Sequence, residues 1–103
     1  MISEGGVGSE ESTGKDSKFA LGQVVVTPGA LKTLTSDEIA TALQRHQNGD
    51  WGMLDDEDRA TNERALASGE RLLSVYVGSS GTRFYIITEW DRSATTVLLP
   101  DEY

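Results

Sequence analysis

The spacing of apolar residues changes once along this chain, and that change limits the folds open to it. After Thr35, the side chains Ile39, Ala42, Leu43 and His46 recur at intervals of three and four, as on one side of a helix. From residue 70 onwards the apolar residues alternate with polar ones, as they do in strands. Helices followed by consecutive strands predict an α+β domain with an antiparallel sheet.

Start and stop residues bound two helices. Thr35 and Glu38 form a T-x-x-E capping box, and Gly49 is a suitable C-terminal stop. Asp55 can cap a second helix over residues 56–68, which Gly69 ends. A shorter helix or turn is expected over residues 29–34, because Thr27 precedes a proline suited to a first helical position.

The remaining segments read as strands separated by turns. Residues 21–27 are rich in valine, which predicts a first strand. Alternation predicts three more strands, over 72–77, 84–90 and 95–99. The turns fall at Ser79-Ser80-Gly81 and Asp91-Arg92-Ser93. We therefore expect an antiparallel sheet of three to four strands with two helices packed on one face.

The N-terminal segment differs from the rest. Residues 1–18 are mostly glycine, serine, glutamate and lysine, which cannot bury enough apolar surface to offset ordering. They predict a disordered tail before a single domain at 19–103. The start lacks a basic, apolar secretory pattern and no apolar run is long enough for a membrane span, so a cytoplasmic protein without membrane contact is expected.

Charge and composition exclude several activities. The net charge is −8, which disfavours direct binding of nucleic acid and favours a basic protein partner. The chain has no cysteine, so disulfides and thiolate metal sites are impossible. The acidic run at 55–58 fails the calcium-loop pattern, because an arginine and an alanine occupy required positions. Neither a metal nor a cofactor is predicted.

Two sets of residues could carry function. A catalytic site would have to use the single histidine, and a ribonuclease-like arrangement would combine His46, Arg71, Glu89 and Thr95. The alternative for His46 is a capping or core side chain at a helix end. A protein-binding surface would use the acidic helix start and the tryptophans, namely Asp50, Trp51, Asp55, Asp56, Asp58 and Trp90. The alternative for both tryptophans is packing.

The pattern resembles a small uncharacterised bacterial family found on plasmids, integron cassettes and other mobile elements. The resembling segments are the run from Leu21 to Leu31, His46-x-x-Gly49-Asp50-Trp51-Gly52, Asp55-x-x-Asp58, Arg71-Leu72-Leu73-Ser74-x-Tyr76, and the run from Ile87 to Pro100. The resemblance implies a genetic context rather than a reaction. With the acidic charge, it predicts an accessory protein that binds a partner, such as a basic enzyme acting on nucleic acid. A ribonuclease-like toxin and a module that oligomerises through a sheet edge remain alternatives.

Overall fold

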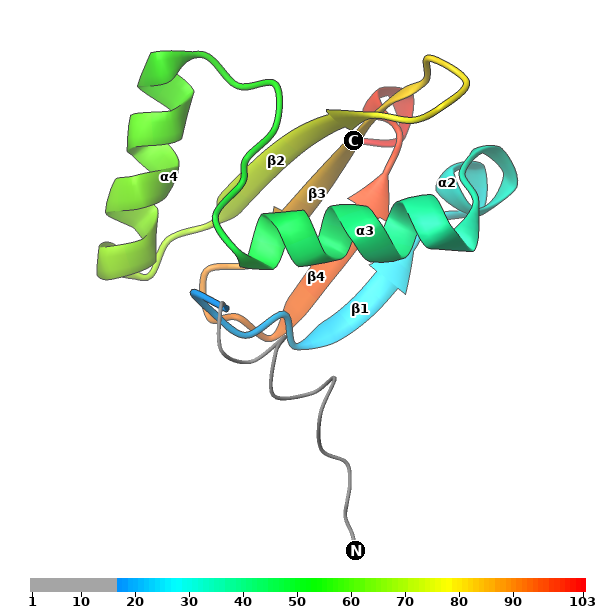
Figure 1. Ribbon diagram of the computed structural model, residues 1–103. Helices are drawn as coiled ribbons and strands as arrows, with labels where there is room; N and C mark the ends of the chain where they lie inside the picture. The colour runs from blue at the N-terminus through cyan, green and yellow to red at the C-terminus, as the bar shows by residue number, and fades with distance from the viewer. Residues whose placement is uncertain (1–16) are drawn as a thin grey trace, which may run out of the picture.

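The computed structural model describes residues 17–103, which form an α+β domain around a four-stranded mixed sheet (Figure 1). Its elements are β1 (Gln23–Val26), α2 (Pro28–Thr33), α3 (Ser36–Gln47), α4 (Asp56–Ser68), β2 (Leu72–Val77), β3 (Arg83–Thr88), β4 (Ala94–Leu98) and the 3-10 helix η1 (Pro100–Glu102). The predicted fold class is confirmed, with two longer helices and four strands. None of the helices in the described part of the chain is long and apolar enough to cross a membrane.

Local hydrogen bonds account for the helix boundaries. The Thr35 hydroxyl accepts the Glu38 N–H at 3.1 Å, while the Glu38 carboxylate accepts the Thr35 N–H at 2.9 Å. Asp55 accepts the Asp58 N–H at 2.8 Å and so begins α4. Gly69 ends α4 with a φ of +75°. These contacts lie within a few residues of each other, which is why the sequence was sufficient to predict them.

The first strand corrects the predicted sheet. The strand order is β1-β4-β3-β2, with β2–β3 and β3–β4 antiparallel but β1 parallel to β4. The sheet is therefore mixed rather than wholly antiparallel. Parallel neighbours need a long connection, and here α2, α3, α4, β2 and β3 all lie between the two parallel strands.

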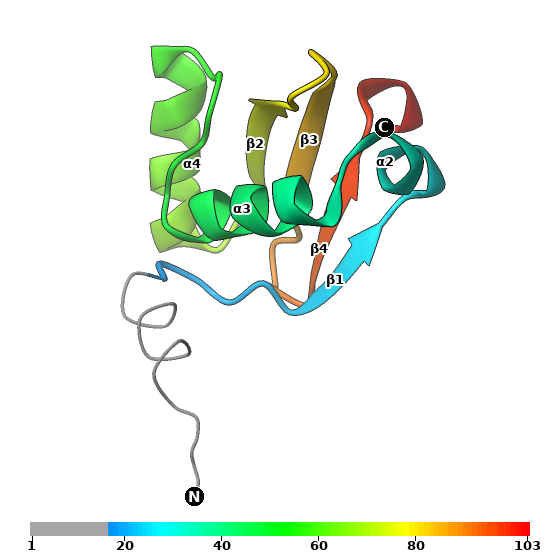
Figure 2. The same ribbon diagram turned by 45° about the vertical axis from the view of Figure 1, so that its right-hand side comes forward.

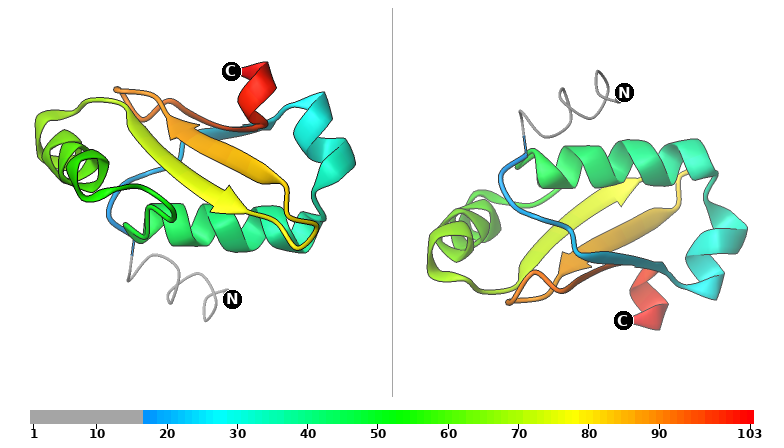
Figure 3. Two further views of the ribbon diagram at one scale, coloured as in Figure 1. Left: turned by 90° about the horizontal axis from the view of Figure 1, so that it is seen from above. Right: turned by 90° about the horizontal axis from the view of Figure 1, so that it is seen from below.

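Helix α3 lies across one face of the sheet, and α4 stands at the β2 margin (Figures 1 and 2). The core beneath α3 consists of Ala30, Leu34, Ala42, Tyr76, Phe84, Ile86 and Val97. A second cluster joins Trp51, Ala65 and Leu72 between α4 and the sheet, with Phe19 packed against it. Seen along the sheet, η1 lies on the side opposite α3 (Figure 3). The C-terminal turn therefore borders the second face of the sheet.

The outer edge of β2 is closed by residues from other segments. The Val75 N–H donates to the Trp51 carbonyl at 3.1 Å, and the Met53 N–H donates to the Val75 carbonyl at 2.8 Å. The buried Asn62 side chain of α4 pairs with Leu73: its Nδ2 donates to the Leu73 carbonyl at 2.6 Å and its Oδ1 accepts the Leu73 N–H at 3.2 Å. The amide of Asn62 thus takes the place of a neighbouring strand.

Replacing Asn62 with alanine is expected to lower the free energy of unfolding by about 2 kcal/mol, because it leaves both Leu73 backbone groups without their partner. Urea unfolding followed by circular dichroism measures the change. Thr61→Ala, at the exposed neighbouring position, should alter the free energy of unfolding by at most about 0.5 kcal/mol. Equal effects of the two substitutions would contradict the role assigned to Asn62.

The start of the domain lies slightly before the predicted boundary. Of the predicted tail at 1–18, residues 1–16 lie outside the described residues. The Lys18 N–H donates to the Gln47 carbonyl at the end of α3, at 2.8 Å. Lys18 therefore already belongs to the folded domain. The next residue, Phe19, packs against the second core cluster.

Candidate protein-binding groove

His46 lies at the end of α3, completely buried in a polar network. Its Nδ1 is 2.6 Å from the Ser74 hydroxyl and its Nε2 is 2.9 Å from the Thr88 hydroxyl. The Thr88 hydroxyl lies 2.7 Å from that of Thr95, which donates to the Leu21 carbonyl at 2.7 Å. The network joins α3 to three strands and to the segment before β1.

The direction of these bonds assigns the tautomer of His46. Since the Thr95 hydrogen goes to the Leu21 carbonyl, the Thr95 oxygen accepts from Thr88. The Thr88 oxygen then accepts the Nε2–H of His46, and the unprotonated Nδ1 accepts the Ser74 hydroxyl. In the neutral ring with its proton on Nε2, both nitrogens of the imidazole therefore have a partner.

Burial, and to a smaller extent the positive charge of Arg92, lower the pKa of His46 to about 3. The rings of Phe19 and Trp51 pack edge-on against the imidazole, with centroids at 5.2 and 5.7 Å. A general base must be able to reach its substrate. The geometry favours the structural interpretation of His46 over the catalytic one.

The four residues of the ribonuclease-like hypothesis do not form one site. Thr95 is buried beside His46, one hydroxyl away. Arg71 lies outside this network and donates to the Tyr103 hydroxyl at 2.8 Å. Glu89 follows β3 and is only partly exposed. Because successive residues of a strand point to opposite faces, Arg71 lies away from the α3 face that Leu72 joins.

Two residues of the predicted binding surface are engaged within the fold. Trp51 is 2% exposed, and its indole N–H donates to Glu63 at 2.8 Å. It is a core residue, which corrects its assignment to the partner surface. Asp50 is paired with Arg45 at 2.8 Å, and this hydrogen bond lowers the pKa of Asp50. The Asp50 side chain remains half exposed in this pair, so Asp50 stays on the surface.

The remaining predicted binding residues are exposed but dispersed. Asp55, Asp56 and Asp58 all lie at the start of α4, and two of them, Asp55 and Asp58, border a groove. Trp90 is 66% exposed in the β3–β4 connection. This connection follows the end of β3, whereas the groove includes Arg83 at its start. Trp90 therefore lies at the opposite end of the strands from the acidic residues.

The groove has a volume of about 460 Å³ and lies on the second face of the sheet, away from α3. Its floor is formed by Leu73, Val75 and Tyr85, and Val75 and Tyr85 are directly paired across β2 and β3. The other lining residues are Met53, Leu54, Asp55, Asp58, Arg83 and Tyr103. The result is an apolar floor with two carboxylates on the α4 side and an arginine among the remaining lining residues.

The apolar part of this groove was not predicted. Met53 is 58% exposed, although methionine is usually a core residue. Tyr103 is held over the second face by Arg71 and packs edge-on against Tyr85, with ring centroids at 6.0 Å. The available signal was in β2, where both alternating sets, one with Leu72 and one with Leu73, contain apolar residues. That pattern indicates a sheet with two apolar faces.

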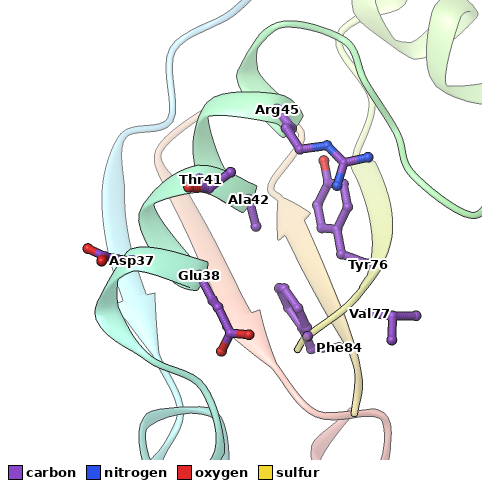
Figure 4. Close-up of a pocket in the computed structure, with 9 residues that line it drawn as sticks. Asp37, Glu38, Thr41, Ala42, Arg45, Tyr76, Val77 and Phe84 are labelled. Carbon is purple, nitrogen blue, oxygen red and sulfur yellow. The ribbon is translucent and has the colours of Figure 1, made fainter. Parts of the chain in front are cut away.

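A smaller hollow of about 260 Å³ lies between α3 and the ends of β2 and β3 (Figure 4). Arg45 stacks over the Tyr76 ring at 4.6 Å at one end, and Glu38 lies at the other. Hydrogen bonds from Ser79, and then from Thr35, lower the pKa of Glu38 to about 2. Since Arg45 is paired with Asp50 and Glu38 holds two backbone segments, both charges already serve the fold.

Similarity to known proteins does not indicate a role for the groove. No protein-family model, curated protein or solved structure matches the chain. Within residues 17–103, His, Asp and Glu side chains do not gather in threes as a metal site requires. The resemblance to a family of mobile elements stays a prediction.

Proposed function

We propose that the protein acts by binding a partner protein in the groove between α4, β2, β3 and Tyr103. The observation that carries this proposal is a groove bordered by Asp55 and Asp58. In it, the apolar side chains of Met53 and Tyr103 are exposed over a floor that is itself partly buried. Exposed apolar surface rimmed by polar residues is typical of interaction sites. A segment with an apolar side chain next to a lysine or arginine matches both features.

The charge of the whole chain supports a basic partner. A net charge of −8 attracts a positively charged surface at long range, and the two aspartates would fix its position at short range. The Arg71 guanidinium lies over the Tyr103 ring, 5.8 Å from its centroid, which is the kind of cation–π contact that an aromatic ring of this groove can make. Proteins that bind nucleic acid are basic, so the partner class we propose is a cytoplasmic nucleic-acid enzyme.

In this proposal the protein is an accessory factor rather than an enzyme. It would compete with the phosphate backbone for the basic surface of its partner, as the resemblance to mobile-element proteins suggests. The ribonuclease-like alternative receives no support from His46, which is buried and has a pKa of about 3.

Removing the two groove carboxylates, in Asp55→Asn with Asp58→Asn, is expected to weaken binding of a short lysine–leucine peptide roughly 5- to 10-fold, since rim charges contribute up to about 1 kcal/mol each. Asparagine also caps helices well, so α4 should remain folded. Fluorescence anisotropy measures affinity, and amide chemical shifts of the 103-residue chain locate the peptide.

The matched control removes two charges elsewhere, in Asp37→Asn with Asp91→Asn. These residues are exposed on α3 and in the β3–β4 turn, away from the groove. The control should bind like the unaltered protein. Equal weakening in both double variants would show that only net charge matters. Unchanged affinity between about 0.1 M and about 0.5 M salt, where the screening length falls from ~10 to ~4 Å, would contradict the charge-based proposal.

A further inference from the structure

The two edges of the sheet differ in whether their outward-pointing backbone groups have hydrogen-bond partners. On β2, the groups of Val75 that point outwards are bonded to Trp51 and Met53, and those of Leu73 are bonded to Asn62. A new strand cannot add there without displacing these partners. The opposite edge is β1, which pairs on one side only with β4.

The hydrogen bonds of β1 show which groups point outwards. The Gln23 N–H donates to the Ser93 carbonyl and the Thr27 N–H donates to the Val97 carbonyl, both at 3.0 Å. Alternate residues of a strand point their backbone groups to opposite sides, so the N–H and C=O of Val24 and Val26 point away from β4. Among residues 17–103, no strand pairs with that side of β1.

The strand at this edge carries no charged residue. Val24 and Val25 are 41% and 42% exposed, and the strand sequence Gln-Val-Val-Val contains neither a charged residue nor a proline. Next to it, a shallow depression of about 310 Å³ is lined by Leu21, Ala40, Leu43, Gln44 and Gln47. Natural edge strands are usually protected from pairing by short length, charges, prolines or bulges. β1 is short, at four residues, but has no charge or proline.

We infer that β1 pairs antiparallel with β1 of a second copy of this chain, around a two-fold axis at Val25. In that register Val24 exchanges both backbone hydrogen bonds with Val26 of the partner subunit, which joins the two sheets into one. The local charge at this edge does not oppose this occupant. The net charge of −8 on each copy opposes association at long range, but the strand residues that meet across the axis are uncharged, so no like charges come into contact there.

The symmetry of the edge supports the same occupant. A two-fold interface requires a surface that is complementary to itself, and a neutral strand with one outward-pointing residue on each side of Val25 meets that requirement. The pairing lies at the edge opposite the groove, so it neither uses nor blocks Asp55 and Asp58. The inference therefore stands independently of the proposed function.

Sedimentation equilibrium of the full chain tests the pairing. We expect a monomer–dimer equilibrium between about 10 µM and about 1 mM, because interfaces below about 1,200 Å² are often weak. Val24→Lys places like charges across the axis and should leave only monomer. Val77→Lys is the matched control, since Val77 is a comparably exposed valine, 47%, at the end of β2. It should dimerise as the unaltered chain does.

A second variant and a second measurement distinguish loss of pairing from loss of folding. Val24→Pro removes an outward-pointing N–H and no bond to β4, so it should also be monomeric and folded. In the unaltered chain, hydrogen exchange at the Val24 and Val26 amides should slow by at least about tenfold as the dimer forms, whereas the inward-pointing Val25 amide should be protected at all concentrations.

Three outcomes would overturn the inference. The unaltered chain could remain monomeric at the highest concentration. It could dimerise equally well with Val24→Lys and Val77→Lys. It could dimerise while the Val24 and Val26 amides exchange at an unchanged rate. Each would show that β1 is not the interface, whatever the groove binds.

Discussion

Lowering the pH from about 7 to about 5 is expected to reduce the free energy of unfolding by roughly 2 kcal/mol, through His46 alone. Burial, and then the charge of Arg92, lower the pKa of this side chain from 6.5 to about 3. The unfolded chain therefore takes up a proton below pH 6.5 that the folded chain refuses. The stabilisation is complete above pH 6.5, falls as the pH decreases, and is lost near pH 3.

The carboxylates act in the same direction but at lower pH. Hydrogen bonds lower the pKa of Glu38, Asp50, Asp91 and Glu102 below ordinary values of 3.8 to 4.5. Their contributions are present above those ordinary values and are lost as the pH falls below them. The interval from about pH 7 to about pH 5 thus reports on His46 with little carboxylate contribution.

Urea unfolding at a series of pH values measures this slope, with the fluorescence of buried Trp51 as the signal. In His46→Gln the slope between about pH 7 and about pH 5 should vanish. That variant should also be less stable at neutral pH by about 2 kcal/mol, because glutamine cannot reproduce both imidazole hydrogen bonds. A slope that survives the substitution would show that another group titrates, and that the buried network has been misassigned.

The second large effect is expected at Gly52, where alanine should lower the free energy of unfolding by about 3–5 kcal/mol. Gly52 has a φ of +76°, which side chains rarely adopt. A Cβ there would overlap the Val75 carbonyl oxygen and come within 2.8 Å of the Tyr76 ring. The substitution would force apart the two hydrogen bonds that close the β2 edge and would displace the neighbouring Trp51.

Gly69→Ala is the matched control for this prediction. Gly69 has nearly the same φ, +75°, but a Cβ there meets nothing within 4 Å. Gly69→Ala should therefore lower the free energy of unfolding by about 1 kcal/mol, which is the cost of placing alanine in a left-handed backbone conformation. Chemical denaturation of both variants measures the difference, which isolates the close approach of the chain to β2. Similar losses at the two glycines would mean that the linker between α3 and α4, residues 48–55, can move away from β2.

The two glycines also illustrate the limits of the sequence. Gly69 was predicted as a helix end, because its role depends on the helix immediately before it. The role of Gly52 depends on Val75, more than twenty residues away, and no local pattern indicates that contact. The same holds for Asn62, which reads as a polar residue of a helix but completes a strand edge.

The candidate groove also combines residues that the sequence indicates with residues that it does not indicate. Asp55 and Asp58 could be selected from the sequence, because an acidic cluster at a helix start is a local feature. Trp51 was selected with them and is buried, since the linker folds under α4 and places its indole against Phe19 and His46. Met53 and Tyr103 were missed, because the groove exists only once the linker and the C-terminal turn meet over β2 and β3.

By itself, the sequence determined the helices, the strands, the caps and the acidic character of this protein. These follow from side-chain periodicity and from hydrogen bonds between residues a few positions apart. Only the tertiary structure decided that β1 runs parallel to β4, that one edge of the sheet is closed and the other open, and that His46 is a neutral core residue. Those outcomes depend on which distant surfaces come together, and the alternation of a strand specifies its faces but not its neighbours.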